Sequence, residues 1–336
     1  MNMESKSSIL TDQFGRVHDY LRISLTERCN LRCVYCMPEN GIVLRPKAEF
    51  MTKNELLSIA QTFVELGVKK IRLTGGEPLV RSDAKEIIEE LSILPVELAI
   101  TSNGVLIDKF IGTFKKCNLK SINISLDSFK EEKFNAITRR NYFHEIISNI
   151  NLLLQEGFHV KINAVIIKGT NDHEIIDFIE FTKDKNVHFR FIEFMPFDGN
   201  KWDWSKGLSY KEIMEMVNKQ YGEKVKKIQD SKNDTSKNYN IEGYQGTFAV
   251  ISSVTNPFCD SCNRLRLTAD GKIKNCLFSN SETDILGALR KGESITTLIK
   301  ESVWNKKSMR GGMNSFEDFS NPELNQKNRS MVSIGG

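Results

Sequence analysis

Six of the seven cysteines in this chain fall into two groups of three. The first group is Cys29, Cys33 and Cys36, and the second is Cys259, Cys262 and Cys276. Thiolates bind the irons of a [4Fe–4S] cluster, and three of them leave one iron without a protein ligand. Such an iron can bind and activate a small molecule, so each group predicts a four-iron cluster with an open position. From spacing alone, a structural zinc completed by a distant Cys or His is an alternative for the first group.

The second group encloses a basic segment, NRLRLTADGKIKN, which predicts a hairpin around its Asp-Gly turn. Arg264 and Arg266 are two positions apart and therefore share one face of the first strand of this hairpin. Guanidinium groups there can bind phosphates bidentately beside the second cluster. The remaining cysteine, Cys117, is interpreted as an ordinary buried thiol.

The composition is typical of a compact globular protein, since the 336 residues are 40% hydrophobic and 27% charged. A net charge of +4 is too small to predict binding to nucleic acid or to a membrane surface, so any basic site must be local. No apolar run is long enough to span a bilayer, and the first residues lack the apolar core of a signal peptide. We therefore expect a cytoplasmic protein whose clustered cysteines stay reduced and serve metal or redox chemistry.

The elements that must position these cysteines alternate between strand-like and helix-like segments from residue 20 to about residue 194. Strands are predicted over residues 20–26, 69–74, 96–101, 119–127, 159–167 and 187–194, with amphipathic helices between them. This alternation is typical of parallel βα units. The first cysteine group directly follows the first strand, at the carboxyl end where barrel enzymes carry their catalytic groups.

The repeat stops near residue 200. Beyond it we predict a helix near 209–221, a polar loop or hairpin tip over 223–240, strands over 247–254 and 264–276, and a helix around 282–291. The predicted fold class is α/β, a partial (β/α)6 TIM-like barrel with a smaller C-terminal α+β extension that carries a second iron–sulfur cluster. The predicted boundaries are 14–200 for the barrel, 201–320 for the extension and 321–336 for a weakly structured tail that ends in Gly-Gly.

Five of the six predicted strands carry polar side chains on one face, because successive residues of a strand alternate sides. These residues are Arg22, Ser24, Thr26, Arg72, Thr74, Asn123, Ser125, Asp127, Lys161, Asn163, His188 and Arg190. A closed eight-stranded barrel would fill its interior with apolar side chains. We therefore predict an open barrel with a wet, basic interior that binds a bulky anion. For any single position, a polar edge residue facing solvent is the alternative.

The first cysteine motif, with Tyr35 before its third cysteine, resembles the signature of the radical S-adenosylmethionine superfamily. TGGEP at residues 74–78 is similar to the second motif of that superfamily. The resemblance implies a partial barrel of the radical SAM type and disfavours zinc. It also implies that S-adenosylmethionine chelates the open iron and yields a 5′-deoxyadenosyl radical that abstracts a hydrogen atom. Gly75 and Gly76 would let the backbone approach the methionyl end of this cofactor, although a Gly-Gly pair is often only a turn.

Nearly the whole chain resembles one branch of the superfamily, the GTP 3′,8-cyclases of the molybdenum cofactor biosynthesis protein A family. The likeness is carried by LRISLTERCNLRCVYCMP, IRLTGGEPLVR, TSNG, INISLD, KINAVIIKG, RFIEFM, FCDSCNRLRLTADGKIKNCLF and the terminal IGG. It implies a lyase that converts GTP to (8S)-3′,8-cyclo-7,8-dihydroguanosine 5′-triphosphate, the first step of molybdenum cofactor (molybdopterin) biosynthesis. Ser102 within TSNG and the polar segment 223–240 depart from the family pattern.

The resemblance also implies roles for individual residues, matched position by position. Cluster ligands are expected to be Cys29, Cys33 and Cys36, and Cys259, Cys262 and Cys276. Residues expected around S-adenosylmethionine are Tyr35, Gly76, Ser125 and Met195. Residues expected to bind GTP are Arg22, Arg72, Thr101, Lys161, Arg264, Leu265 and Arg266. Catalytic roles are expected for the first three cysteines, Arg264, Arg266, and the terminal pair Gly335 and Gly336, which would enter the active site.

The expected cofactors are two [4Fe–4S] clusters and S-adenosyl-L-methionine, with GTP as the substrate. The expected partners are a reductant protein such as a flavodoxin-type donor and a downstream cyclic pyranopterin monophosphate synthase, with no membrane and no nucleic acid; a homodimer is compatible with the sequence. Two alternatives remain, a radical enzyme that modifies a peptide with an auxiliary cluster, and a non-catalytic iron–sulfur or zinc protein that binds RNA. The first would carry more C-terminal cysteines, and the second would have no use for the GGEP motif.

Overall fold

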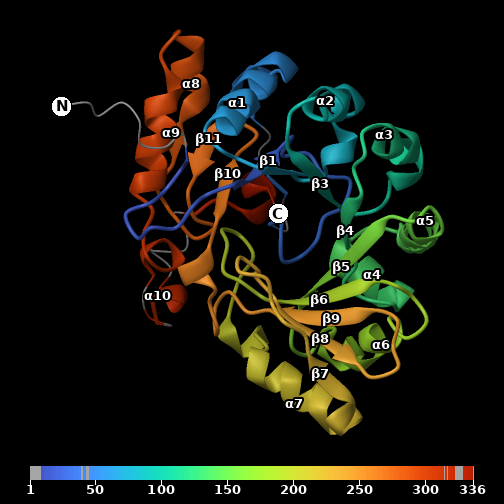
Figure 1. Ribbon diagram of the computed structural model, residues 1–336. Helices are drawn as coiled ribbons and strands as arrows, with labels where there is room; N and C mark the ends of the chain where they lie inside the picture. Colours follow the sequence, from blue (N-terminus) through green and yellow to red (C-terminus); the bar gives the residue numbers. More distant parts are fainter. Residues whose placement is uncertain are drawn as a thin grey trace.

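The computed structural model of the chain describes residues 9–38, 41–42, 45–313, 315, 317–321 and 328–335. Its strands form one continuous sheet of twelve strands, and the helices lie mainly around the outside of this sheet (Figure 1). None of the helices in the described part of the chain combines the length and the apolar character that a membrane span requires.

Six consecutive strands form the centre of the sheet and confirm the predicted βα alternation. They are β1 (Tyr20–Ser24), β2 (Lys70–Thr74), β3 (Glu97–Ser102), β4 (Ser121–Ser125), β5 (His159–Ile166) and β6 (His188–Glu193). Each is parallel to the next. The helices of this part are α1 (Lys53–Glu65), α2 (Ala84–Leu91), α3 (Ile111–Lys116), α4 (Glu131–Thr138), α5 (Phe143–Gln155) and α6 (Ile175–Glu180). The predicted partial barrel is therefore confirmed.

The C-terminal extension adds strands to both edges of this barrel, which the sequence did not predict. Its elements are α7 (Tyr210–Tyr221), β7 (Val225–Lys227), β8 (Lys237–Ile241), β9 (Thr247–Ile251), β10 (Arg264–Leu267), β11 (Lys272–Lys274), β12 (Thr283–Asp284), α8 (Ile285–Arg290), α9 (Ile295–Trp304), α10 (Glu317–Ser320) and α12 (Met331–Ile334). Strand β9 pairs in parallel with β6, and β10 pairs in parallel with β1. The described barrel thus runs β10-β1-β2-β3-β4-β5-β6-β9, with antiparallel strands at either end.

The boundary predicted at residue 200 lies between β6 and α7. Strands from both sides of this boundary belong to the same sheet, because β9 and β10 cover the edges of β6 and β1. Edge strands expose unpaired backbone groups, and this arrangement pairs them. The barrel and its extension are therefore one structural unit around a shared interior.

The alternation of side chains along the strands separates an apolar outer face from a polar inner face. Leu21 and Ile23 of β1 are fully buried and belong to the same apolar cluster as Leu56 and Phe63 of α1. Arg22, between these two strand residues, points to the opposite side. Helix packing on the outer face thus fixes which side chains reach the interior of the barrel.

Candidate active site

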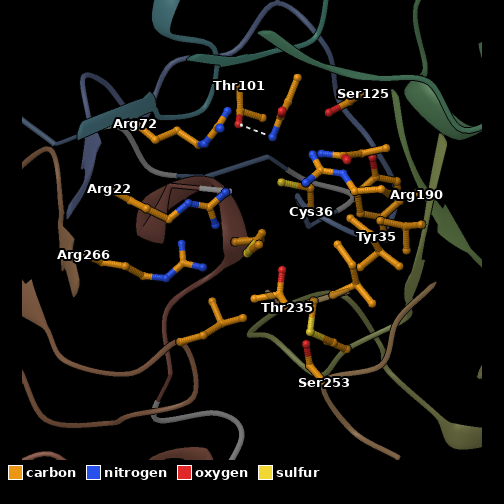
Figure 2. A pocket seen from close by; sticks show the side chains of 18 of the residues that line it. Arg22, Tyr35, Cys36, Arg72, Thr101, Ser125, Arg190, Thr235, Ser253 and Arg266 are labelled. Carbon is orange, nitrogen blue, oxygen red and sulfur yellow. Dashed lines mark hydrogen bonds between the residues drawn. The ribbon is translucent and has the colours of Figure 1, made fainter. Parts of the chain in front are cut away.

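The polar face of the barrel encloses a cavity of about 300 Å³, and all six clustered cysteines line it. The other predicted site residues on its wall are Tyr35, Gly76, Ser125, Met195, Arg22, Arg72, Thr101, Arg264 and Arg266. Figure 2 shows several of these side chains pointing into a common space. One cavity therefore brings together two cysteine groups that lie far apart in the sequence.

The first three cysteines lie on the loop that follows β1, as predicted. The Cys36 amide donates to the Cys33 carbonyl at 3.1 Å, and the Tyr35 hydroxyl donates to Asp127 Oδ2 at 2.7 Å. Burial raises the pKa of Cys29 to about 11 and also raises the pKa values of Cys33 and Cys36. Thiolates in this setting need cations beside them, which the irons of a cluster supply. The donor set therefore fits an iron–sulfur cluster.

Gly75 and Gly76, after β2, pack against the backbone of the cysteine loop. A Cβ atom on Gly76 would lie 2.4 Å from the carbonyl oxygen of Arg28, and one on Gly75 would lie 2.7 Å from that of Thr26. The Gly76 amide also donates to the Thr26 carbonyl at 2.7 Å. Glycine is therefore needed at both positions for the close approach to the cysteine loop, and the approach to the cofactor stays a prediction.

Three arginines from adjacent strands stand in one row on the cavity wall. The register of the sheet pairs Arg22 of β1 with Arg266 of β10 on one side and with Arg72 of β2 on the other. Figure 2 shows the three side chains extending side by side into the cavity. Like charges on directly opposed strand positions repel each other. Burial and the charge of Arg266 lower the pKa of Arg22. A bound polyanion would offset both the repulsion between the guanidinium groups and the cost of burying their charge.

Three buried guanidinium nitrogens have no hydrogen-bond partner within the described residues. They are Nε of Arg22, Nε of Arg190 and Nη1 of Arg264. All three arginines line the cavity. Because buried polar groups are normally paired, these donors indicate an acceptor that binds in the cavity. Phosphate oxygens match a set of guanidinium donors.

The phenol of Tyr20 lies among these arginines and accepts a hydrogen bond from Arg72 Nε. Burial alone raises the pKa of Tyr20, but the charges of Arg72, Arg22 and Arg264 outweigh burial and lower it to about 7. Above that pH, Tyr20 is a phenolate whose negative charge stabilises the neighbouring guanidinium groups. A bound polyanion would take over this role and return the phenol to its neutral form.

We therefore expect the binding of inorganic triphosphate to take up about one proton per site at about pH 8. The affinity should fall as the pH rises through the pKa of Tyr20, because the phenolate competes with the ligand for the same cations. Calorimetry in two buffers of different ionisation enthalpy measures the uptake. Tyr20→Phe should abolish it, and equal heats for the unchanged chain in both buffers would contradict the prediction.

The second cysteine group lies on the segments that flank the β10–β11 hairpin. Cys259 and Cys262 precede β10, and Cys276 follows β11. The Lys306 ammonium lies 3.4 Å from Cys262 Sγ, and the backbone amide of Arg310 donates to Cys259 Sγ at 3.4 Å. Burial alone raises the pKa of Cys262, but Lys306 outweighs it and lowers the pKa. Burial raises the pKa values of Cys259 and Cys276. Cys262 therefore has the electropositive setting typical of metal-binding thiolates, and the other two thiols do not.

Sequence reasoning missed the residues that support this second group. Besides Lys306, these include Arg16, whose Nη1 donates to the Cys259 carbonyl at 2.8 Å and to the Ser308 carbonyl at 2.7 Å. No local pattern links these positions to the cysteines, since they become neighbours only through the fold. Among the described residues, no three His, Cys, Asp or Glu side chains are arranged around a single metal ion. The cluster assignment rests on the two groups of thiols and on their surroundings.

Two of the predicted GTP contacts are absent from the cavity wall in the described residues. Leu265 is fully buried in the apolar core because it alternates with Arg264 and Arg266 along β10. Its side chain therefore points away from the cavity. Lys161 lies on β5, where burial and the charge of Arg190 lower its pKa to about 8. Lys161 therefore lies close enough to Arg190 to feel its charge, although it does not line the cavity.

The tail reaches the arginine row through Gly335, which follows α12. The carbonyl oxygen of Gly335 accepts a hydrogen bond from Arg266 Nη1 at 2.6 Å. Its φ is +87°, and an added Cβ would lie 2.8 Å from Thr74 Oγ1 and 2.9 Å from Ser24 Cβ. Glycine is therefore required both by the backbone conformation and by the space. Gly336, the other residue of the predicted pair, lies outside the described residues.

The polar segment 223–240 forms the β7–β8 hairpin, and its tip reaches the cavity. Thr235 lines the cavity wall (Figure 2). The carbonyl oxygen of Asn233 accepts a hydrogen bond from Arg264 Nη2 at 3.1 Å. Sequence reasoning missed this role because a polar segment without apolar periodicity has the composition of an exposed loop. It also left Arg190 and Tyr20 out of the predicted site, although alternation along β6 had placed Arg190 on the polar face.

Two family models match the chain, Radical SAM superfamily over residues 23–182 and Molybdenum Cofactor Synthesis C over residues 187–311. The chain is 46% identical to "GTP 3′,8-cyclase, mitochondrial" of Arabidopsis thaliana over 336 residues, which cover 98% of this chain and 84% of that protein. It is 43% identical to the GTP 3′,8-cyclase of Listeria monocytogenes over 303 residues, which cover 89% of this chain and 91% of that protein.

The chain spans about half the length of several animal relatives. One is human molybdenum cofactor biosynthesis protein 1, which is 44% identical over 98% of this chain and 51% of that protein. Among solved structures, Streptococcus suis SuiB bound to S-adenosylmethionine aligns with a TM-score of 0.63, covering 96% of this chain and 79% of that one. At 14% identity, this likeness shows the fold alone. On the strength of the sequence matches, the chain belongs to the GTP 3′,8-cyclase family of radical S-adenosylmethionine enzymes.

Proposed function

We propose that this chain converts GTP to (8S)-3′,8-cyclo-7,8-dihydroguanosine 5′-triphosphate, the first step of molybdenum cofactor biosynthesis. The observation that carries the proposal is the row of Arg22, Arg72 and Arg266 in the cavity that both cysteine groups line. A nucleoside triphosphate brings about four negative charges, which such a row and the unpartnered nitrogens of Arg190 and Arg264 can bind.

Cys29, Cys33 and Cys36 would hold the [4Fe–4S] cluster that the radical SAM superfamily uses. Around the adjoining S-adenosylmethionine we propose Tyr35, Gly76, Ser125 and Met195, all of which line the cavity. When bound, the cluster and S-adenosylmethionine together supply a 5′-deoxyadenosyl radical. The chain contributes apolar wall residues that exclude water and competing hydrogen donors; these include Leu31, Phe134 and Val165.

We further propose that Cys259, Cys262 and Cys276 would hold a second [4Fe–4S] cluster, which would supply an open iron for binding the guanine base. Support comes from their place on the wall of the same cavity and from the cation of Lys306 beside Cys262. With the triphosphate on the arginine row, the base and the ribose would be held inside the barrel between the two cysteine groups. Binding at both ends restricts the orientation of the nucleotide.

The proposed reaction begins with abstraction of the hydrogen atom at ribose C3′. The resulting carbon radical attacks C8 of guanine, and the cyclised radical then takes up one electron and one proton. Methionine and 5′-deoxyadenosine leave as co-products. The task of the arginine row in this sequence is to hold C3′ and C8 of one nucleotide close together while the bond forms.

The two alternatives have less support. An RNA-binding protein would present its cations on an open surface, whereas Arg22 and Arg190 hold buried nitrogens inside the barrel. A peptide-modifying enzyme would have no need for a row of guanidinium groups. As partners we propose a flavodoxin-type reductant and a downstream cyclic pyranopterin monophosphate synthase. Location in the cytoplasm stays a prediction, and the Arabidopsis relative is named as mitochondrial.

The proposed function is tested with protein purified under nitrogen. Iron, sulfide and zinc analysis should give about eight irons per chain and no zinc, as two four-iron clusters require. Incubation with GTP, S-adenosylmethionine and a strong reductant should then yield 5′-deoxyadenosine and a cyclised nucleotide by mass analysis, with ATP as the control nucleotide. About one or two zinc ions without sulfide would refute an enzyme of this class. Formation of 5′-deoxyadenosine that GTP does not stimulate would refute GTP as the substrate.

A further inference from the structure

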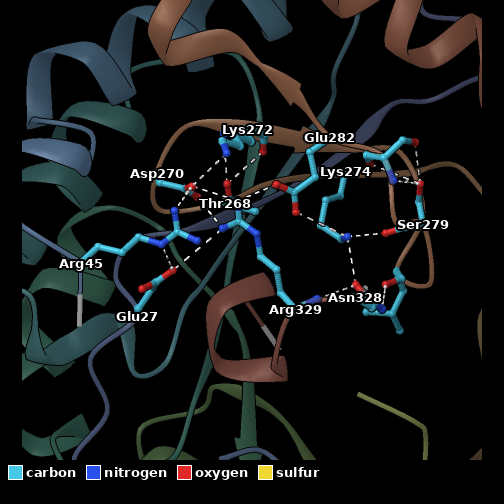
Figure 3. A network of polar contacts seen from close by, with 12 residues as sticks. Glu27, Arg45, Thr268, Asp270, Lys272, Lys274, Ser279, Glu282, Asn328 and Arg329 are labelled. Carbon is cyan, nitrogen blue, oxygen red and sulfur yellow. Dashed lines mark hydrogen bonds and ion pairs between the residues drawn. The ribbon is translucent and has the colours of Figure 1, made fainter. Parts of the chain in front are cut away.

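An ion network anchors the C-terminal tail just before it meets the arginine row (Figure 3). Arg329 forms a bidentate pair with Asp270, with Nη1 2.7 Å from Oδ1 and Nη2 2.9 Å from Oδ2. Its Nη2 also donates to Glu282. Asp270 lies in the turn between β10 and β11, and Arg266 lies on β10. The same hairpin therefore binds the tail at two points, through Asp270 and through Arg266.

A second arginine connects this network to the loop of the first cysteine group. Arg45 Nη1 lies 2.9 Å from Asp270 Oδ2, and Arg45 Nε lies 3.4 Å from Glu27 Oε1. Glu27 lies two residues before Cys29, and its side chain is 1% exposed, against 4% for Asp270. Figure 3 shows Glu27, Arg45, Asp270 and Arg329 gathered together. Asp270 thus joins the first cysteine loop, the hairpin and the tail.

Asn328 holds the neighbouring position of the tail. Its Oδ1 accepts a hydrogen bond from Lys274 Nζ at 3.0 Å, and its Nδ2 donates to the Leu277 carbonyl at 3.1 Å. Lys274 and Leu277 lie on either side of Cys276 in the sequence. The tail is therefore fixed at Asn328 beside the second cysteine group, and α12 leads from there to Gly335.

We propose that Arg329 is a positioning residue that presents the carbonyl of Gly335 to Arg266 and so sets the geometry of the arginine row. Arg329 is not among the residues that line the cavity, so it acts through the tail. Its side chain is 12% exposed, and breaking its pair would leave the buried carboxylate of Asp270 without one of its cations. The inference rests on the proposed function, in which Arg266 binds the triphosphate of GTP.

The first test compares Arg329→Gln with Arg290→Gln. Arg290 is the matched control, because it pairs with Glu55 at 2.7 Å and its side chain is 39% exposed. Arg329→Gln should lower single-turnover cyclisation of GTP by at least about tenfold, the effect of losing a coupled contact. Iron content and the formation of 5′-deoxyadenosine without GTP should stay unchanged. Arg290→Gln should leave cyclisation unaffected.

The second test asks whether Arg329 acts through the tail. If it does, Arg329→Gln should have no further effect in a chain that lacks Gly335 and Gly336, because the contact it serves is already lost. The same fold-loss in the full and the shortened chain would overturn the proposal, as would no loss in the full chain. Arg329→Lys keeps a cation between Asp270 and Glu282 and should restore part of the rate. If Arg329→Gln loses iron, Arg329→Lys is compared with the unchanged chain instead.

Hydrogen exchange separates a failure of this inference from a failure of the proposed function. The amides of Ile334 and Gly335 donate to the carbonyls of Ser330 at 3.3 Å and Met331 at 3.1 Å. Arg329→Gln should speed their exchange while the amides of β1 and β2 stay protected. This readout needs no GTP, so it tests the anchor even if the unchanged enzyme fails to cyclise GTP. Unchanged exchange of the tail would overturn the positioning role.

Discussion

Replacing Cys276 with alanine should abolish the cyclisation of GTP and leave the cleavage of S-adenosylmethionine intact. Cys276 follows β11, whereas the first three cysteines follow β1, so the two proposed clusters have separate ligands. Loss of a direct ligand lowers metal affinity and activity more than loss of a supporting residue does. The amount of cyclised product should therefore fall by at least about a hundredfold. 5′-Deoxyadenosine should still form in single-turnover assays under nitrogen, no longer coupled to GTP.

Cys117→Ala is the matched control, because Cys117 packs beside the apolar core and is not among the residues of the cavity wall. It should change neither the iron content nor the coupling of the two products. Cys276→Ala should instead lose about four of about eight irons. If Cys276→Ala abolished 5′-deoxyadenosine formation while the first cluster stayed intact, the proposed separation of roles would be wrong.

A loss of similar size is expected from Gly335→Ala. The new Cβ would lie within 2.9 Å of both Ser24 and Thr74, in a backbone conformation with a φ of +87°. The tail or the ends of β1 and β2 must therefore move, and a displacement of about 1 Å near the reacting groups lowers the rate by about a hundredfold. Single-turnover cyclisation measures the effect, and both clusters and S-adenosylmethionine binding should remain. Deletion of Gly335 and Gly336 should act in the same direction.

Gly243→Ala provides a control at a glycine with the same φ. Gly243 also has a φ of +87°, but no atom lies within 4 Å of an added Cβ. The cyclisation rate of this variant should stay close to that of the unchanged chain, because the added Cβ displaces no neighbouring atom. Equal rates and equal coupling for Gly335→Ala and the unchanged chain would mean that the tail is a frayed end without a role.

Much of the fold follows from local patterns in the sequence. Five of the six central strands lie within the segments predicted from apolar runs and turns, and β3 extends one residue beyond its segment, to Ser102. The alternation along the strands places Arg22, Arg72 and Arg190 on the wall of the cavity. Three cysteines after the first strand mark the end of the barrel at which we propose that the chemistry takes place. These features depend on neighbours in sequence, which is why a single sequence reveals them.

The remaining features depend on contacts between distant segments. Nothing in the local periodicity of β9 or β10 indicates that they pair with β6 and β1, because strand pairing is a property of the whole chain. Lys306 beside Cys262 and Arg329 on Asp270 are ordinary cations in the sequence and gain their roles only when the extension folds against the barrel. Leu265 lies between two predicted site residues in the sequence, yet the geometry of a strand turns its side chain into the core.

Strand β1 can complete its pairing only when most of the chain has been synthesised. Its neighbour β2 follows soon after it, but its other neighbour, β10, emerges roughly 240 residues later, on the order of tens of seconds at ribosomal speed. Until then, one edge of the nascent barrel exposes backbone groups that can pair with another chain. The second set of thiols emerges together with β10. Closure of the barrel edge and delivery of those thiols are therefore a single late event in the life of the nascent chain.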